Sequence, residues 1–149
     1  METHSGDLYH KLILEHNRAP LYFEKRPDAM RVVDATNPLC GDKFKIFIDI
    51  ENQTIVRATF HGYGCAVSKA SASVLMKKIQ RRPVAEALTS IREFISRVKP
   101  GDHATKRLPP PDEETSAFLP VKNYPGRLKC ATLTWEALEE DLKGLILEK

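Results

Sequence analysis

The sequence predicts an α+β fold, a single domain in which a small antiparallel sheet of about three strands packs against helices. Between residues 44 and 60, hydrophobic and polar side chains alternate with the period of two of a half-buried strand, and from residue 67 they follow a helical period. A length of 149 residues with 42% hydrophobic and 29% charged composition is typical of one globular domain. We therefore predict one domain over 1–149 without internal repeats.

The first part of the chain predicts a short helix, an irregular arm and a strand. Residues 7–17 have the amphipathic pattern of a helix, which Pro20 ends. An irregular arm over the core follows as far as residue 30. A strand over 31–35 then leads to Asn37.

The centre of the chain predicts a β-hairpin with its turn at Asn52-Gln53. The buried face of its first strand consists of Phe44, Ile46, Ile48 and Ile50, which alternate with Lys45, Phe47, Asp49 and Glu51. The returning strand places three side chains on one face, Val56, Ala58 and Phe60. Because a hairpin returns the chain to the end of the sheet where it began, we expect Cys40 and Asp42 to lie near Cys65.

Three longer helices are predicted after the hairpin. The first spans residues 67–80, and its apolar face is Val67, Ala70, Val74, Leu75 and Ile79, with Ser68 and Ser71 on other faces. The second begins at Pro83, ends at Lys99, and buries Leu88, Ile91, Ile95 and Val98. The last begins at Gly126 and buries Leu128, Trp135, Leu138, Leu142 and Leu145. Between the last two, residues 102–125 are irregular, with one short helix around 112–118.

Three cysteines and one aspartate form the candidate site: Cys40, Asp42, Cys65 and Cys130. An odd number of cysteines argues against a disulfide framework. Pro38 and Gly41 force a turn that folds Cys40 and Asp42 toward one point. Three sulfurs and one oxygen make a four-coordinate set that suits Zn²⁺. The spacing alone leaves open that these are buried thiols without a ligand.

The position of each cysteine in the chain predicts a different property of its thiol. Cys65 directly precedes a helix, where the macrodipole and unpaired N–H groups lower a cysteine pKa. Cys130 shares a flank with Arg127 that is displaced from the apolar stripe of the last helix, so we expect its side chain to point out of the core. Cys40 lies on the most pliable backbone, which makes it the thiol that leaves the metal and attacks a sulfur electrophile such as a persulfide.

The segments around the cysteines resemble a known family. Asn37-Pro38-Leu39-Cys40-Gly41-Asp42, the stretch Gly62 to Ser73, and Arg127-Leu128-Lys129-Cys130-Ala131 are similar to the three ligand segments of the IscU/SufU, NifU N-terminal-like, iron-sulfur assembly family. Two departures favour its SufU branch. IscU-type chains carry a histidine where this chain has Lys129, and they lack the insertion seen here at about 99–125.

This resemblance implies a zinc-dependent sulfurtransferase that accepts persulfide sulfur from a SufS-type cysteine desulfurase and passes it toward the SufBCD scaffold. Carried over by position, the zinc ligands are Cys40, Asp42, Cys65 and Cys130, with Cys40 as the sulfur acceptor. Arg127 matches the family's arginine near the metal and is assigned a catalytic role in docking or in steering the persulfide. The resemblance also implies that a histidine of the desulfurase replaces Cys40 on zinc.

Two alternatives to sulfur transfer stay open. The first is a scaffold that assembles a transient iron-sulfur cluster on the same cysteines. The second is a binding module in which zinc is structural and a basic surface docks a partner.

Charge and the remaining polar residues exclude other classes. A formal charge of +3 does not favour a nucleic-acid partner, and no run approaches the roughly 18 to 20 apolar residues of a membrane helix, so we expect a cytoplasmic protein without membrane contact. His61 is expected to be a hydrogen-bonded structural residue, and His4, His10, His16 and His103 to be surface residues. No Ser-His-acid constellation is legible.

Overall fold

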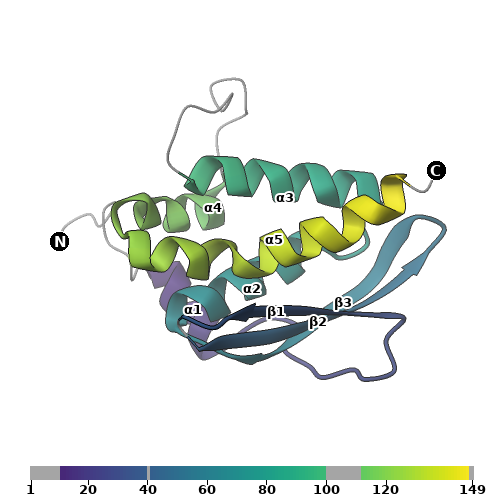
Figure 1. The fold of residues 1–149 in the computed structure, drawn as a ribbon, viewed down its shortest axis with the longest axis horizontal. Helices are drawn as coiled ribbons and strands as arrows, with labels where there is room; N and C mark the ends of the chain where they lie inside the picture. The colour runs from purple at the N-terminus through teal and green to yellow at the C-terminus, as the bar shows by residue number, and fades with distance from the viewer. Residues whose placement is uncertain (1–10, 40, 100–111, 148–149) are drawn as a thin grey trace.

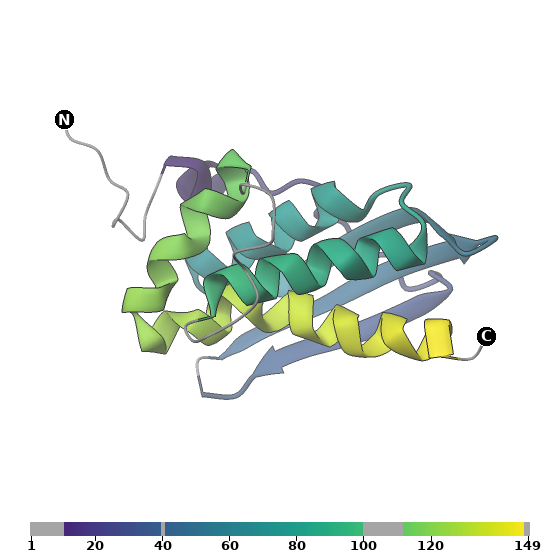
Figure 2. The same cartoon turned by 90° about the horizontal axis from the view of Figure 1, so that it is seen from above.

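The computed structural model describes residues 11–39, 41–99 and 112–147 and confirms the predicted α+β class. In chain order its elements are α1 (Lys11–Arg18), β1 (Arg31–Asn37), β2 (Asp42–Glu51), β3 (Thr54–Tyr63), α2 (Ala66–Ile79), α3 (Val84–Val98), α4 (Glu113–Phe118), the 3-10 helix η2 (Leu119–Asn123) and α5 (Pro125–Leu147). The antiparallel sheet has the order β1-β2-β3. Helices α2 and α5 cover one face of it, and α3 lies over them (Figures 1 and 2).

The predicted hairpin forms, with one irregularity that changes which side chains face the core. Asn52 and Gln53 both have positive φ, 51° and 65°, as a tight turn matched to the strand twist requires. Asp49 pairs with Arg57, but the next residue, Ile50, pairs with Ile55, so Val56 is the extra residue of a β-bulge. The bulge turns Ile55 into the core and leaves Val56 38% exposed. The prediction that Val56 shares one face with Ala58 and Phe60 was therefore wrong, because those two are fully buried.

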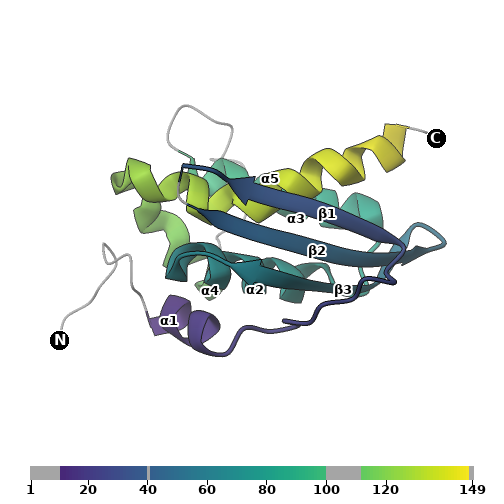
Figure 3. The ribbon, with the colours of Figure 1, turned by 60° about the horizontal axis from the view of Figure 1, so that its bottom comes forward.

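The face of the sheet turned away from the helices is partly covered by the arm between α1 and β1 (Figure 3). Arg26 forms an ion pair with Asp49, and the N–H of Met30 donates to the same carboxylate at 2.9 Å. Phe47 lies on this outer face but is only 2% exposed. The strand alternation had grouped Phe47 with solvent-facing residues, because a local pattern does not reveal that another segment covers this end of the sheet.

Helix α2 lies at the centre of the fold and is buried on almost every side. Its off-stripe serines, Ser68, Ser71 and Ser73, are all buried, which the helical period did not indicate. Ser71 accepts a hydrogen bond from Trp135 Nε1 at 2.7 Å and donates to the carbonyl of Ala131. Because buried hydroxyls need partners, these contacts explain how polar residues are accommodated between α2 and α5.

The remaining helices begin and end close to their predicted positions. Pro83 directly precedes α3, and Asp112 caps α4 by accepting the N–H of Thr115 at 2.8 Å. The rings of Phe94 and Trp135 stack at 3.7 Å between α3 and α5. Part of the predicted first helix and residues 100–111 of the predicted 99–125 insertion lie outside the described residues, and the assignment of an insertion stays a prediction.

Candidate metal centre

Three of the four predicted ligands meet at one end of the sheet. Asp42 is the first residue of β2, Cys65 directly precedes α2, and Cys130 lies in the second turn of α5. One ligand atom from each, a carboxylate oxygen or a sulfur, lies within 4.8 Å of the other two. Cys40 lies outside the described residues, so its place in the set stays a prediction. The hairpin thus brings Asp42 and Cys65 together, as expected from its topology.

The loop before Asp42 has the turn that its sequence predicts. Asn37 ends β1 opposite Asp42, and its side-chain oxygen accepts the N–H of Leu39 at 3.2 Å. Its carbonyl accepts the N–H of Gly41 at 2.9 Å, and Gly41 has φ +77°, a conformation that glycine adopts without strain. Asp42 is therefore delivered by a hydrogen-bonded turn rather than by a loose loop.

Cys65 directly precedes α2, as predicted, and its side chain caps the N-terminus of that helix. Its sulfur accepts the N–H of Ser68 at 3.4 Å, and its own N–H donates to Asp42 Oδ1 at 3.1 Å. The second contact fixes the carboxylate relative to the thiol, because one oxygen of Asp42 is held by the backbone of Cys65. The helix terminus and the strand are thereby joined at the site.

The hydrogen bond between the two thiols shifts their pKa values in opposite directions. A hydrogen bond from Cys130, supported by the N–H of Ser68, lowers the pKa of Cys65 to about 5 even though burial opposes the thiolate. The same contact with Cys65, together with burial and the Asp42 carboxylate, raises the pKa of Cys130 above its ordinary value. The contact between the two sulfurs therefore favours the ionised form of Cys65 and the protonated form of Cys130.

Cys130 is 1% exposed, so the prediction that it points out of the core was wrong. The flank of α5 that carries it packs against α2, where Ala131 is bonded to Ser71, and the sulfur faces Cys65. Arg127 lies one turn earlier and is half-buried. Its role in catalysis or docking is untested and stays a prediction.

Gly64 is a site residue whose role the sequence patterns did not reveal. A Cβ atom at this position would lie 2.5 Å from Ser68 Oγ, 2.6 Å from Asp42 Oδ1 and 2.8 Å from Phe44 Cε2. No side chain fits there without moving the carboxylate. The run Gly62-Tyr63-Gly64 was the available signal, because closely spaced glycines at a strand end indicate close approach of other atoms.

One atom of the site is incompletely bonded. Asp42 is 2% exposed, and its Oδ2 has no hydrogen-bond partner among the residues that the structure describes. A buried carboxylate oxygen without a partner is unfavourable unless a cation or a donor satisfies it. Ligand atoms around a tetrahedral Zn²⁺ at ~2.3 Å lie within about 4 Å of one another, so the observed group needs only a small closure to hold such an ion.

A second polar cluster lies away from the candidate centre, and it corrects two expectations. His16 is 11% exposed rather than a surface residue. Its Nδ1 lies 2.7 Å from Ser73 Oγ and its Nε2 lies 3.0 Å from Glu114 Oε2, a Ser-His-acid arrangement built from residues far apart in the chain. Ser73 is 0% exposed and its oxygen also accepts the N–H of Leu21 at 2.8 Å, so it cannot reach a substrate. We assign this cluster a structural role.

The other histidines give no further ligands within the described part of the chain. His61 stacks on Phe23 with ring centroids 4.6 Å apart, which supports its structural interpretation. His4, His10 and His103 lie outside the described residues. Of the helices that the structure describes, none combines the length and apolar character that crossing a membrane requires.

The fold and the donor set define a small α+β protein with a candidate thiolate and carboxylate metal centre at the end of a hairpin. The NifU-like N-terminal domain family matches residues 8–143, so the chain belongs to this family. It is 34% identical to the zinc-dependent sulfurtransferase SufU of Bacillus subtilis, over 95% of this chain and 92% of that protein. It is 29% identical to the iron-sulfur cluster assembly scaffold protein IscU of Thermotoga maritima, over 93% of this chain and 94% of that protein.

Solved structures agree with this assignment. The crystal structure of the SUF-system protein FiSufU from Fervidobacterium islandicum AW-1 superimposes with a TM-score of 0.80 at 29% identity, over 91% of this chain and 96% of that chain. A NifU-like N-terminal protein from Brucella abortus shares the fold, with a TM-score of 0.75 at 23% identity, over 96% of both chains. The resemblance inferred from the cysteine segments is confirmed at the level of the family.

Proposed function

We propose that this protein is a zinc-dependent sulfurtransferase of iron-sulfur cluster biogenesis. In this proposal it accepts persulfide sulfur from a SufS-type cysteine desulfurase and passes it toward a SufBCD-type scaffold. The main support is the convergence of Asp42, Cys65 and Cys130 around a buried, unpartnered carboxylate oxygen. The relationship to a protein named as a zinc-dependent sulfurtransferase supports the choice of metal and reaction.

The described residues would hold the ion with two sulfurs and one oxygen. The contacts of Cys65 with Cys130 and with the N–H of Ser68 at the start of α2 favour its thiolate. Asp42 Oδ1 is oriented by the N–H of Cys65, which leaves Oδ2 for the ion. Cys40 would supply the fourth donor. When bound, zinc keeps coordinated thiols ionised at neutral pH.

In the proposed reaction Cys40 is the sulfur acceptor. Its thiolate attacks the terminal sulfur of the desulfurase persulfide, so a new S–S bond forms on Cys40 while the desulfurase cysteine leaves as a thiolate. No external oxidant is consumed, because the persulfide is only exchanged between two thiols. Arg127 is proposed to steer the anionic persulfide or to assist docking.

The decisive experiment measures cysteine turnover by a SufS-type desulfurase under reducing conditions, with and without the zinc-loaded protein. We expect saturable stimulation by the wild-type chain and none by Cys40→Ala. Zinc content, measured in parallel, should fall for Cys65→Ala and Cys130→Ala. If Cys40→Ala accepts persulfide as well as the wild type, the acceptor assignment is wrong. If the wild-type chain gives no stimulation of an active desulfurase, the sulfurtransferase proposal fails.

A second candidate function, a scaffold for a transient iron-sulfur cluster, is supported by the relatives that carry the name IscU. Three thiolates can hold iron. Lys129 precedes Cys130 at the position where the IscU branch has a histidine, and this disfavours the scaffold. A visible absorption band that survives gel filtration after anaerobic reconstitution would favour it over sulfur transfer.

A further inference from the structure

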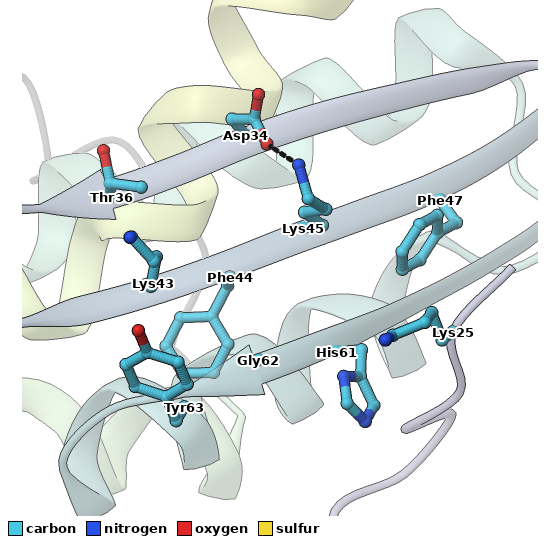
Figure 4. A pocket seen from close by; sticks show the side chains of 10 residues that line it. All are labelled: Lys25, Asp34, Thr36, Lys43, Phe44, Lys45, Phe47, His61, Gly62 and Tyr63. Atoms are coloured by element: carbon cyan, nitrogen blue, oxygen red, sulfur yellow. Dashed lines mark hydrogen bonds and ion pairs between the residues drawn. The ribbon is translucent and has the colours of Figure 1, made fainter. Parts of the chain in front are cut away.

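The outer face of the sheet carries a groove that the metal centre does not use. It has a volume of about 460 Å³ and is bounded by all three strands and the arm, as Figure 4 shows. The side chains that shape it include Lys25, Lys43, Lys45, Phe47, His61 and Tyr63. The structural cause of this hollow is the uneven covering of the sheet face by the arm.

The groove exists because the arm covers one end of the outer face of the sheet more completely than the other end. At the far end the arm covers the strands, since Asp49 is engaged by Arg26 and by Met30. At the near end the arm contacts His61 through the ring of Phe23. The other residues of the two cross-strand rows there are exposed: Thr36, Lys43 and Tyr63 in one row, and Asp34 and Lys45 in the other. Gly62, which pairs with Phe44, also lines the hollow and contributes no side chain to it.

The groove combines an apolar floor with a cationic rim. The floor includes Phe47, which is 2% exposed, and the exposed apolar group is the ring of Tyr63, which is 62% exposed and lies at the opposite end of the groove from Phe47 (Figure 4). Lys45 is neutralised by Asp34, with its Nζ 2.6 Å from Oδ1. Lys25 and Lys43 have no acidic partner among the described residues, so two ammonium groups stand uncompensated at the rim. Charge complementarity therefore favours an anionic occupant with an apolar group.

The position of the groove connects it to the candidate metal centre. Lys43 follows Asp42 directly, and Tyr63 lies two residues before Cys65. Successive residues of a strand point to opposite faces, so the groove and the centre lie back to back at the same end of the sheet. Leu39, in the loop at this end, is 95% exposed and extends the apolar surface toward the centre. A protein that works at the metal centre can reach the groove as well.

We propose that this groove is a docking surface for an acidic segment of the sulfur-donating desulfurase, with an aromatic or aliphatic side chain of that segment packed against the exposed ring of Tyr63. The inference rests on the proposed function, because the occupant must be the protein that delivers sulfur to the adjacent centre. The lysines act by steering and orienting the partner, and they touch neither the metal nor the transferred sulfur.

The test is the affinity of zinc-loaded protein for a purified SufS-type desulfurase, measured by isothermal titration calorimetry at two salt concentrations. For Lys25→Glu/Lys43→Glu we expect the Kd to rise by about tenfold or more and its salt dependence to weaken. The control Arg81→Glu/Lys143→Glu makes the same change of net charge on exposed or half-buried residues elsewhere and should bind like the wild type. Tyr63→Ser tests the apolar part without a change of charge, and zinc content should be unchanged in all variants.

The outcomes separate this inference from the proposed function. If the wild type stimulates the desulfurase and both double variants bind it equally well, the groove inference is overturned while the sulfurtransferase stands. If the wild type neither binds nor stimulates an active desulfurase, both are overturned. Weakened binding of SufBCD alone would assign the groove to the acceptor, and a wild-type dimer that Lys25→Glu/Lys43→Glu converts to a monomer in light scattering would assign it to a second copy. Either result overturns the assignment of the groove to the desulfurase.

Discussion

Two compact polar clusters in this molecule each contain one carboxylate, and they differ in whether their polar atoms are all hydrogen-bonded within the protein. Asp42, Cys65 and Cys130 form one at the end of the hairpin, and His16, Ser73 and Glu114 form the other between α1, α2 and α4. In the second cluster the histidine nitrogens, the serine oxygen and a carboxylate oxygen are all bonded within the protein, and Lys77 also binds Glu114. In the first, Asp42 Oδ2 is buried without a partner in the described chain.

This difference is a better guide to function than residue type. A Ser-His-acid arrangement suggests catalysis by its composition, but a fully buried and fully bonded serine can only support the fold. A carboxylate with one unsatisfied oxygen beside two sulfurs implies a ligand that completes it. Four measurements test this difference between the two clusters.

The largest effect is expected for Cys65→Ser. Serine is a good helix cap, so the N-terminus of α2 should remain capped while the sulfur donor is lost. We expect zinc affinity to fall by more than about 100-fold, because loss of a direct ligand should exceed the 10- to 100-fold effect of losing an outer-shell partner. Competition with a chelating dye measures this, and unchanged affinity would remove Cys65 from the ligand set.

Gly64→Ala should damage the centre through sterics alone. The added methyl group would lie 2.6 Å from Asp42 Oδ1, so we expect a loss of about 1 to 3 kcal/mol of folding free energy and at least roughly tenfold weaker zinc binding. The matched control is Gly144→Ala in α5, where a Cβ meets nothing within 4 Å. That change should stabilise the protein by about 0.5 to 1 kcal/mol. Equal effects of the two substitutions in urea denaturation would contradict the steric argument.

His16→Ala should lower stability without touching the metal. It removes a partner of Ser73 and of Glu114, but each keeps one other contact, so we expect a loss of about 1 to 2 kcal/mol. Zinc affinity and sulfur acceptance should equal those of the wild type. Reduced sulfur acceptance by a folded, zinc-loaded His16→Ala protein would mean that the second cluster is functional after all.

The smallest effect is a pH dependence at Glu114. Burial raises its pKa, but the contacts with Lys77 and His16 outweigh burial and hold the pKa below its ordinary value of 4.5. The resulting stabilisation is present above pH 4.5 and is lost as the pH falls further through the folded-state pKa. Glu114→Gln should therefore flatten the acid limb of the stability curve, measured by denaturation between pH 3 and 6. An unchanged acid limb would show that other carboxylates dominate it.

Local sequence patterns predicted much of this fold because turns, strands and helices depend mainly on residues close together in the chain. The Asn52-Gln53 turn and the alternation of the first hairpin strand fixed the strand pairing, and that topology brought Asp42 to Cys65. The family was also recognisable from the three cysteine segments, each of which is a short continuous stretch.

The failures share a cause, which is that they depend on segments distant in the chain. The bulge at Val56, the covering of Phe47 by the arm and the burial of Cys130 against α2 have no local signature. His16 finds Ser73 and Glu114 across 57 and 98 residues, so its surroundings could not be predicted from its own segment. Gly64 belongs to the same class, because its neighbours are atoms of other elements.

The central position of α2 has a consequence for motion. This helix begins directly after Cys65 of the candidate metal centre, bonds α5 through Ser71, bonds His16 through Ser73 and reaches α4 through Lys77. Its amides should be among the slowest to exchange with deuterium, while α1, a short helix at the periphery, opens first. The centre is thus built on the last part of the molecule to unfold, so fraying at the edges leaves the spacing of Asp42 and Cys65 intact.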